Sequence, residues 1–499
     1  MRATLVALAC GLASACTSAD TAESQPPAAH GEAAADEEWT EGGSVATEVD
    51  GIAQEQAGDP VGAAATEEAA EAVAPADGDA DAEGEPAPGT IATSGTLNTR
   101  YIGRWGEGED DHDLYSLLGA TVGDPEEDPY SAYLLGRVSW DVDGDQGDED
   151  SPFFSLEDTY DHSLNGRVYE AYLDLNDTGL DLLRFGRQAL YETPAYVRFD
   201  GAALSTERAG EDDHELGAYG GRTVHEYESS PEGDAVYGAY ASNSMWKGGR
   251  TRLDYMHLED EQQLGDERDD LWATQVQQVF GREVRLESGY SWLEGAPREF
   301  DARATWLPYE AGWLVQGSYY ALLQTEGSLA EEIDPFFDTL QEYFPYSLSR
   351  LLVSKTFETG WSLEGGADLR DVDDSEDEGE FNRDYERYHL TSTIEDFVVE
   401  DLALALTGDY WTSDGSDTNS WGVDLTRELS EKLRGSIGSF YQLYKNDFLL
   451  DEEREDVRTY YVSLRWRPEK RLTWGLGLEH EDTDIGDFDT LTARSTWNF

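Results

Sequence analysis

The sequence of 499 residues has no run of about 18 apolar residues, the length that a helix needs to cross a bilayer, so it predicts no helical membrane span. Methionine is scarce at 3 residues, and both cysteines, Cys10 and Cys16, lie close to the start. Basic residues are few, with 34 Lys and Arg against 107 Asp and Glu. The net charge of −73 argues against nucleic-acid binding, because a polyanion is bound by a basic surface.

The acidic charge itself has two interpretations, which the sequence leaves open. At the mouth of a pore it would attract cations and repel anions. In a salty habitat, or facing divalent ions, it would be a solvated surface with no selective role.

The first residues, MRATLVALACGLASAC, are typical of a bacterial export signal, with a basic Arg2, an apolar stretch and small residues before a cleavage point. We therefore expect a signal peptide over residues 1–15. The stretch LASAC also resembles a lipoprotein signal, in which the cysteine after the cut is acylated, but Ala13 stands where leucine is commonest. Lipidation of Cys16 and ordinary signal-peptidase cleavage both fit, and either leaves too few thiols for an internal disulfide.

Residues 16–92 are rich in Ala, Glu, Asp, Gly and Pro, and no Lys or Arg occurs between Arg2 and Arg100. Such a segment has too little apolar area to offset the loss of chain entropy, so we expect a disordered acidic linker. It would be a spacer between an anchor and a domain, or an interaction arm.

Alternating stretches fill the rest of the chain, which is rich in Tyr (27), Trp (14) and Gly (50). In RTYYVSLRW, the side chains of Tyr460, Val462, Leu464 and Trp466 share one face, and a second alternating stretch after RPEK completes a hairpin. Similar stretches occupy 166–176, 250–260 and 400–411. A soluble propeller or sandwich would also have short strands, but here the second face carries Thr, Gly, Arg, Asp and Glu rather than a dry core.

We therefore predict an all-β fold over residues 93–499: a transmembrane antiparallel up-and-down β-barrel of about 18 to 22 strands. The segment SLAEEIDPFFDTLQEYF at 328–344 breaks the pattern with helical spacing. It is expected as a helical insertion in a loop, either a gate in the mouth or a cap on the rim.

The last nine residues, LTARSTWNF, alternate as a closing strand, with Leu491, Trp497 and the terminal Phe499 on one side. This ending resembles the carboxy-terminal signature of bacterial outer-membrane β-barrel proteins. The resemblance implies that Trp497 and Phe499 form a signal for the barrel assembly machinery, and that the protein lies among the lipids of the outer membrane of a Gram-negative-type bacterium.

The passage LLRFGRQALYETPAYVRFDGAAL at 182–204, preceded by YEAYLDLN, resembles passages of porin-like channels and of alginate-export-type barrels, which implies a channel lined by ionic side chains. Arg184, Gly186 and Gln188 share a face, and Asp174 is expected opposite Arg184. The stretch from Pro194 to Gly201 is a candidate inward-folded constriction. The predicted lumenal ladder of charged residues is Glu170, Asp174, Arg184, Arg187, Arg198 and Asp200, with Arg222, Arg252 and Asp254 in similar surroundings. These charges would select solutes, or would only neutralise one another.

No catalytic motif or cofactor site is predicted. The eight histidines show no metal-site spacing, and the loops around 141–150 lack the full calcium pattern. His112 and His214 each have acidic neighbours, as chance would give in so acidic a chain. The sequence thus predicts a porin-like, non-enzymatic channel for passive diffusion of small polar or charged solutes. The alternative is a non-porous barrel that sheathes a partner protein or an export complex, and association into homo-oligomers stays open.

Overall fold

The computed structural model describes most of the chain after residue 91. The described residues are 92–106, 108–125, 128–144, 153, 162–210, 213–224, 234–262, 265–308, 311–325, 344–375, 384–413, 416–447, 452–483 and 486–499. The expected signal peptide, Cys16, nearly all of the linker and nearly all of the expected helical segment at 328–344 lie outside these residues.

The described residues form twenty-two β-strands. Their bounds are β1 (Thr93–Gly106), β2 (Glu109–Val122), β3 (Tyr130–Asp141), β4 (Leu164–Leu175), β5 (Leu182–Leu190), β6 (Val197–Ser205), β7 (Glu215–Thr223), β8 (Ala235–Asn243), β9 (Gly249–Gln262), β10 (Gly265–Phe280), β11 (Val284–Leu293), β12 (Ala296–Trp306), β13 (Trp313–Leu322), β14 (Tyr346–Thr356), β15 (Trp361–Val372), β16 (Tyr385–Ile394), β17 (Leu402–Ser413), β18 (Ser416–Ser430), β19 (Leu433–Asp447), β20 (Glu452–Glu469), β21 (Leu472–Thr483) and β22 (Gly486–Asn498). No helix in the described part of the chain has the length and apolarity needed to cross a bilayer.

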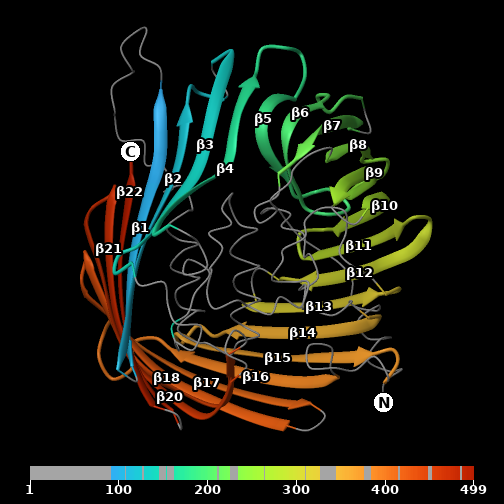
Figure 1. Ribbon diagram of the computed structural model, residues 1–499. Helices are drawn as coiled ribbons and strands as arrows, with labels where there is room; N and C mark the ends of the chain where they lie inside the picture. Colours follow the sequence, from blue (N-terminus) through green and yellow to red (C-terminus); the bar gives the residue numbers. More distant parts are fainter. Residues whose placement is uncertain are drawn as a thin grey trace.

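Every strand pairs antiparallel with the next, and β22 pairs with β1, so the sheet closes on itself. Figure 1 shows this closed wall, with β1 in blue beside β22 in red. The predicted all-β, up-and-down barrel is confirmed, at the upper limit of the expected strand number. The predicted hairpin at 458–479 is β20 and β21, in register from Arg458 opposite Asp482.

The two ends of the barrel differ in their connections. One end carries Thr93 and Phe499 and is called the terminus end here; several of its connections are short, as between β10 and β11 or β20 and β21. The opposite, loop end carries the longest connections, 142–163 and 323–345. This asymmetry is typical of outer-membrane barrels.

The outer surface is an aliphatic band between two rings of aromatic side chains. Exposed aliphatic residues such as Leu134, Leu253, Leu406 and Ile437 lie mid-strand. Near the terminus end the exposed rings are Tyr130, Trp246, Phe280, Trp313, Trp361, Trp466, Trp474 and Trp497, and near the loop end they are Trp140, Tyr237, Trp272, Tyr388, Tyr410, Trp421 and Tyr460. Apart from Trp246, which lies between β8 and β9, these side chains come from the outward positions of their strands, where successive side chains alternate between two faces.

The height of this band matches a bilayer. Tyr130 and Trp140 belong to the two rings and lie ten residues apart on β3. At ~3.3 Å per residue that is about 33 Å along the strand, and a tilt of roughly 40° reduces it to about 25 Å across the membrane. The barrel therefore carries an apolar belt of membrane height.

The closing seam between β22 and β1 includes the aromatic residue Phe499. Phe499 and Gly95 exchange two backbone hydrogen bonds, each 3.0 Å long, and the Phe499 ring packs against Trp497 with ring centroids 5.1 Å apart. A Cβ added to Gly95 would lie 2.6 Å from Cζ of Phe499 and would also collide with the carbonyl oxygen of Gly119. The last residue is thus part of the wall, and Gly95 makes room for it.

We predict that Gly95→Ala destabilises the barrel by about 1–3 kcal/mol, the usual effect of overpacking a tight site. Gly408→Ala is the matched control, because a Cβ at Gly408 meets nothing within 4 Å. In detergent, the denaturant concentration at the midpoint of unfolding should be lower for Gly95→Ala than for the unchanged protein. For Gly408→Ala it should equal that of the unchanged protein. Equal midpoints would contradict the account of the closing seam.

Candidate functional site

The lumenal face of the barrel is lined by cross-strand pairs of arginine and acid. Arg104 of β1 contacts both Asp111 and Asp113 of β2, at 2.5 and 3.0 Å. On another part of the wall, Arg387 of β16 donates a 2.8 Å hydrogen bond to Asp409 of the neighbouring strand β17. Such pairs let a polar wall form without leaving charges unpaired in a partly dehydrated interior.

The predicted pair of Asp174 and Arg184 is confirmed. The two residues are in register on β4 and β5, and Arg184 donates to both carboxylate oxygens, at 2.8 and 3.0 Å. Its guanidinium lies 3.5 Å from the centre of the Tyr172 ring. Glu170, also inward on β4, lies within electrostatic reach of Arg184 and Arg198. This part of the predicted ladder is therefore lumenal.

Three members of the predicted lumenal set, Arg187, Asp200 and Arg222, instead project from the outer face. They are register partners across β5, β6 and β7. They alternate with inward residues such as Phe199, which is fully buried, and Asp200 is 49% exposed. The prediction was wrong because it grouped charges by their closeness along the chain. Successive side chains of a strand point to opposite faces, so Arg184 and Arg187, three residues apart, lie on opposite faces of β5.

Arg198 has the same parity as Asp200, but its side chain is turned toward β4. The guanidinium lies 5.0 Å from the ring centre of Tyr169 and 5.8 Å from that of Tyr196. Tyr169 is buried in a cluster with Leu117 and Leu135 of the inner face. Arg198 thus sits at the junction between β4 and the tip of the β5–β6 hairpin.

Arg252 and Asp254, predicted to share an inward face of β9, form the most buried ion pair of the site. Arg252 donates through Nε and Nη2 to Asp254 at 2.9 to 3.0 Å, and Asp254 is only 2% exposed. The other edge of the guanidinium contacts Glu192, and its face lies 4.0 Å from the ring centre of Tyr240. Arg252 therefore joins the wall to a distant segment of the chain.

That segment, residues 191–196, connects β5 to β6 and folds into the barrel. Besides the contact of Glu192 with β9, the carbonyl oxygen of Pro194 accepts a 3.0 Å hydrogen bond from Arg298 on β12. The Thr193 hydroxyl donates to the Ala195 carbonyl at 2.6 Å and fixes the turn. A connection that reaches β9 and β12 crosses part of the lumen, so the expected inward fold is present, slightly earlier than the stretch 194–201.

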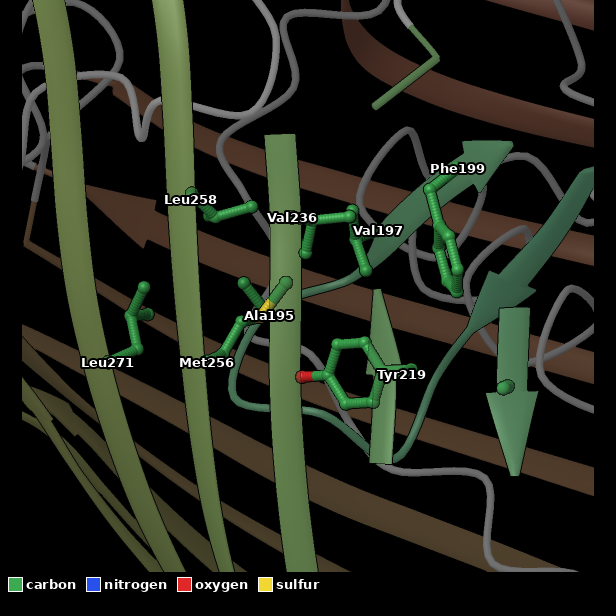
Figure 2. Packing of buried hydrophobic residues seen from close by; sticks show 9 residues of the cluster. Ala195, Val197, Phe199, Tyr219, Val236, Met256, Leu258 and Leu271 are labelled. Atoms are coloured by element: carbon green, nitrogen blue, oxygen red, sulfur yellow. The ribbon is translucent and has the colours of Figure 1, made fainter. Parts of the chain in front are cut away.

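An apolar cluster supports the inward segment. Its buried members are Ala195, Val197, Phe199, Ala203, Tyr219, Val236, Met256, Leu258 and Leu271. Figure 2 shows eight of these side chains, labelled, gathered along β6 to β10 and the segment before β6. Several inward residues of β6 to β10 are thus apolar and pack against the segment before β6, beside the polar pair of Arg252 and Asp254 on β9.

Sequence reasoning missed several residues of the site, and alternation would have found some of them. The stretches TRYIGRW and DDHDLY place Arg104 opposite Asp111, as the register shows. Arg298 is harder, because it lies at a bulge where Ser291 pairs with Glu299 and Trp292 with Pro297. Bulges change the parity of a strand without a reliable sequence signal.

The acidic neighbours of His112 are divided between the two faces of β2, and Asp110 alone of the three lies close to its ring, with Oδ2 3.4 Å from Nε2. His112 faces outward and hydrogen-bonds the Tyr101 hydroxyl at 2.9 Å, while Asp111 and Asp113 turn inward to Arg104. The backbone of His214 bridges that of Ala209. Within the described residues, no group of three His, Cys, Asp or Glu side chains that could hold a metal ion is present.

Comparisons with known proteins return no matching family model and no matching curated protein. Solved structures with a similar strand arrangement include the outer-membrane protein OpdK of Pseudomonas aeruginosa, with 11% identity, a TM-score of 0.37 and coverage of 82% of this chain and 99% of that one. OccK8 (OprE) of the same organism has 9% identity, a TM-score of 0.41 and coverage of 82% and 98%. OccAB4 of Acinetobacter baumannii has 11% identity, a TM-score of 0.38 and coverage of 83% and 100%.

We predict that Arg252→Ala destabilises the barrel by about 3–5 kcal/mol, because it leaves the buried Asp254 carboxylate without its partner. The double variant Arg252→Ala/Asp254→Ala should recover much of that loss. Denaturant unfolding of the two single variants and the double variant gives the coupling energy. Additive effects would contradict the assignment of a buried pair.

Proposed function

We propose that this protein is a porin-like channel of the outer membrane of a Gram-negative-type bacterium, through which small polar or charged solutes diffuse passively. The observation that carries the proposal is the contrast between the two faces of one wall. Outside, an aliphatic band lies between two aromatic rings; inside, arginines and acids pair across neighbouring strands.

The outer face supports placement in a membrane. Exposed Leu, Val, Ile and Trp side chains over a closed surface would be an aggregation hazard in water, whereas lipid tails cover them without penalty. A closed ladder of strands is one of the two backbone structures that can span a bilayer. The outward Trp497 and Phe499 at the end of β22 fit the proposed recognition by the barrel assembly machinery.

The lumenal side supports passage of polar solutes through a narrowed pore. Segment 191–196 reduces the cross-section, and its ties to Arg252 and Arg298 hold it in place. Paired charges of both signs on the wall order ions and dipoles that pass. The selectivity of the pore would therefore depend on which lumenal charges line the part that segment 191–196 leaves open.

Local preference for anions is expected near the closing seam. Arg100 of β1 and Arg494 of β22 are register partners, both on inward positions. Two guanidinium groups side by side create a positive potential on that wall, although the protein as a whole is strongly acidic.

The proposal is tested by reconstituting the purified protein in a planar bilayer. Steps of current that rise linearly with voltage support an open pore. A correctly folded but silent protein would overturn the channel and favour the alternative, a barrel that sheathes a partner protein or export complex.

We predict that Arg298→Met increases single-channel conductance, because the carbonyl of Pro194 loses its anchor and the constriction widens. Arg427→Met, which removes an exposed arginine at the terminus end of β18, should leave conductance unchanged. Equal conductance of both variants would argue against segment 191–196 as the narrowest part.

We predict that Arg494→Glu shifts the reversal potential in a salt gradient toward cation preference, because a positive lumenal charge becomes negative. The control is Arg458→Glu, which changes charge equally on the outer face, where Arg458 lies 4.2 Å from the Trp421 ring centre. A shift of equal size in the control would mean that surface charge, not the lumen, sets selectivity.

A further inference from the structure

One seam of the barrel wall is paired over a much shorter length than its neighbours. Strands β4 and β5 are in register over four residues only, from Ala171 opposite Arg187 to Asp174 opposite Arg184. The adjoining seams, β3 with β4 and β5 with β6, pair over eleven and nine residues. The part of β4 from Leu164 to Glu170 therefore pairs with β3 alone among the described strands.

Two local features mark the point where the strands part. On β4, Tyr169 is a bulge, because Leu135 pairs with Glu170 while Gly136 pairs with Val168. On β5, Gly186 has a φ of 128°, which a residue with a side chain rarely adopts, and its backbone lies against Ala171 and Tyr172. Beyond this close approach the β5–β6 hairpin bends into the lumen.

The open part of the seam lies within the apolar band. Val168 pairs with Gly136, which lies between Tyr130 and Trp140, the two aromatic ring residues of β3. Leu164 pairs with Trp140 itself. The β4 edge from Val168 to Leu164 thus occupies the loop-end part of the band, where unpaired backbone groups in lipid are strongly unfavourable.

At Val168, a side chain rather than a ladder bond from a described strand holds this edge to β5. Arg187 donates through Nη1 to the carbonyl oxygen of Val168 at 3.0 Å, and through Nε and Nη2 to the two carboxylate oxygens of Asp200 at 2.9 Å. One guanidinium therefore joins β4, β5 and β6 from the outside. These contacts of Arg187 with Val168 and Asp200 are called the clasp here. The clasp accounts for an arginine and an aspartate that project from the apolar outer face of the barrel.

Apolar side chains lie on both sides of the seam. On the lumenal side, Leu117, Leu135 and Tyr169 form a buried cluster with Tyr133 packed against it. On the outer side, Leu164, Val168 and Phe185 are exposed. Apolar side chains therefore lie on both the lumenal and the lipid-facing side of the least paired seam, with the Arg198 guanidinium over the Tyr169 ring between them.

We propose that the β4–β5 seam is a lateral opening through which small apolar molecules pass from the lumen into the outer leaflet, with Arg187 as its clasp. Four ladder pairs and one side-chain clasp separate more readily than the eleven and nine ladder pairs of the adjoining seams. An apolar molecule leaving sideways avoids the charged head-group region, which is the main barrier to its entry from water. The proposal uses the barrel and its membrane placement, but it goes beyond conduction of polar solutes.

The test is uptake of the apolar fluorescent probe N-phenyl-1-naphthylamine by Gram-negative cells that carry the protein in their outer membrane. Glu170→Cys/Gln188→Cys continues the seam's register by one pair and can lock it with a disulfide. Ser436→Cys/Ser463→Cys is the matched lock, on the fully paired seam between β19 and β20. Thiol titration establishes which locks have formed.

The oxidised β4–β5 lock is expected to lower uptake several-fold, toward that of cells without the protein, and a reducing agent should restore it. The β19–β20 lock should have no effect. Unchanged uptake with a formed β4–β5 lock would overturn the lateral opening.

A second variant decides the matter if the lock does not form. Arg187→Met/Asp200→Asn removes both charges of the clasp, and it should raise uptake several-fold, whereas Arg458→Met should not. No rise in the clasp variant would overturn the proposal. Conductance of the same proteins reports on the polar pore separately, so failure of one proposal is distinguishable from failure of the other.

Discussion

The structure depends on one constraint: backbone N–H and C=O groups in contact with lipid must find their partners within the wall. Twenty-two antiparallel strands meet it by closing β1 onto β22. Phe499 takes part through its two backbone bonds to Gly95. Alternation then follows from the strand itself and divides every segment into a lipid-facing side and a lumenal side.

The second consequence concerns charge. A lumen wall is only partly hydrated, so its cations are held against carboxylates of the next strand, as Arg184 is with Asp174 and Arg387 with Asp409. Lysines with described side chains, such as Lys355 and Lys432, lie at the terminus end instead. The guanidinium suits the wall because its planar fork bonds two partners at once. Arg252 uses this property to satisfy Asp254 with one edge and hold Glu192 with the other.

Sequence alternation was enough to predict the barrel, the closing strand, the hairpin of β20 and β21 and the pair of Arg184 with Asp174, because each follows from a period of two and a short turn. It could also have excluded Arg187 from the lumen, since Arg187 has the opposite parity to Arg184. It could not have given the bulges at Tyr169 and Arg298, which shift parity without a sequence signal. Nor could it have joined Glu192 to Arg252, because no local pattern links residues so far apart on the chain.

The constriction and the weak seam are two results of one bend. For segment 191–196 to reach Arg252 and Arg298, the tip of the β5–β6 hairpin must turn into the lumen. It can do so only by leaving β4, which continues to its pairing with Trp140 on β3. Gly186 allows the turn, the apolar cluster around Phe199 stabilises the inward tip, and Arg187 covers the edge that the departure exposes. A wall of continuous ladder bonds would leave no strand end free to narrow the pore, so narrowing by this hairpin requires a less tightly paired seam beside it.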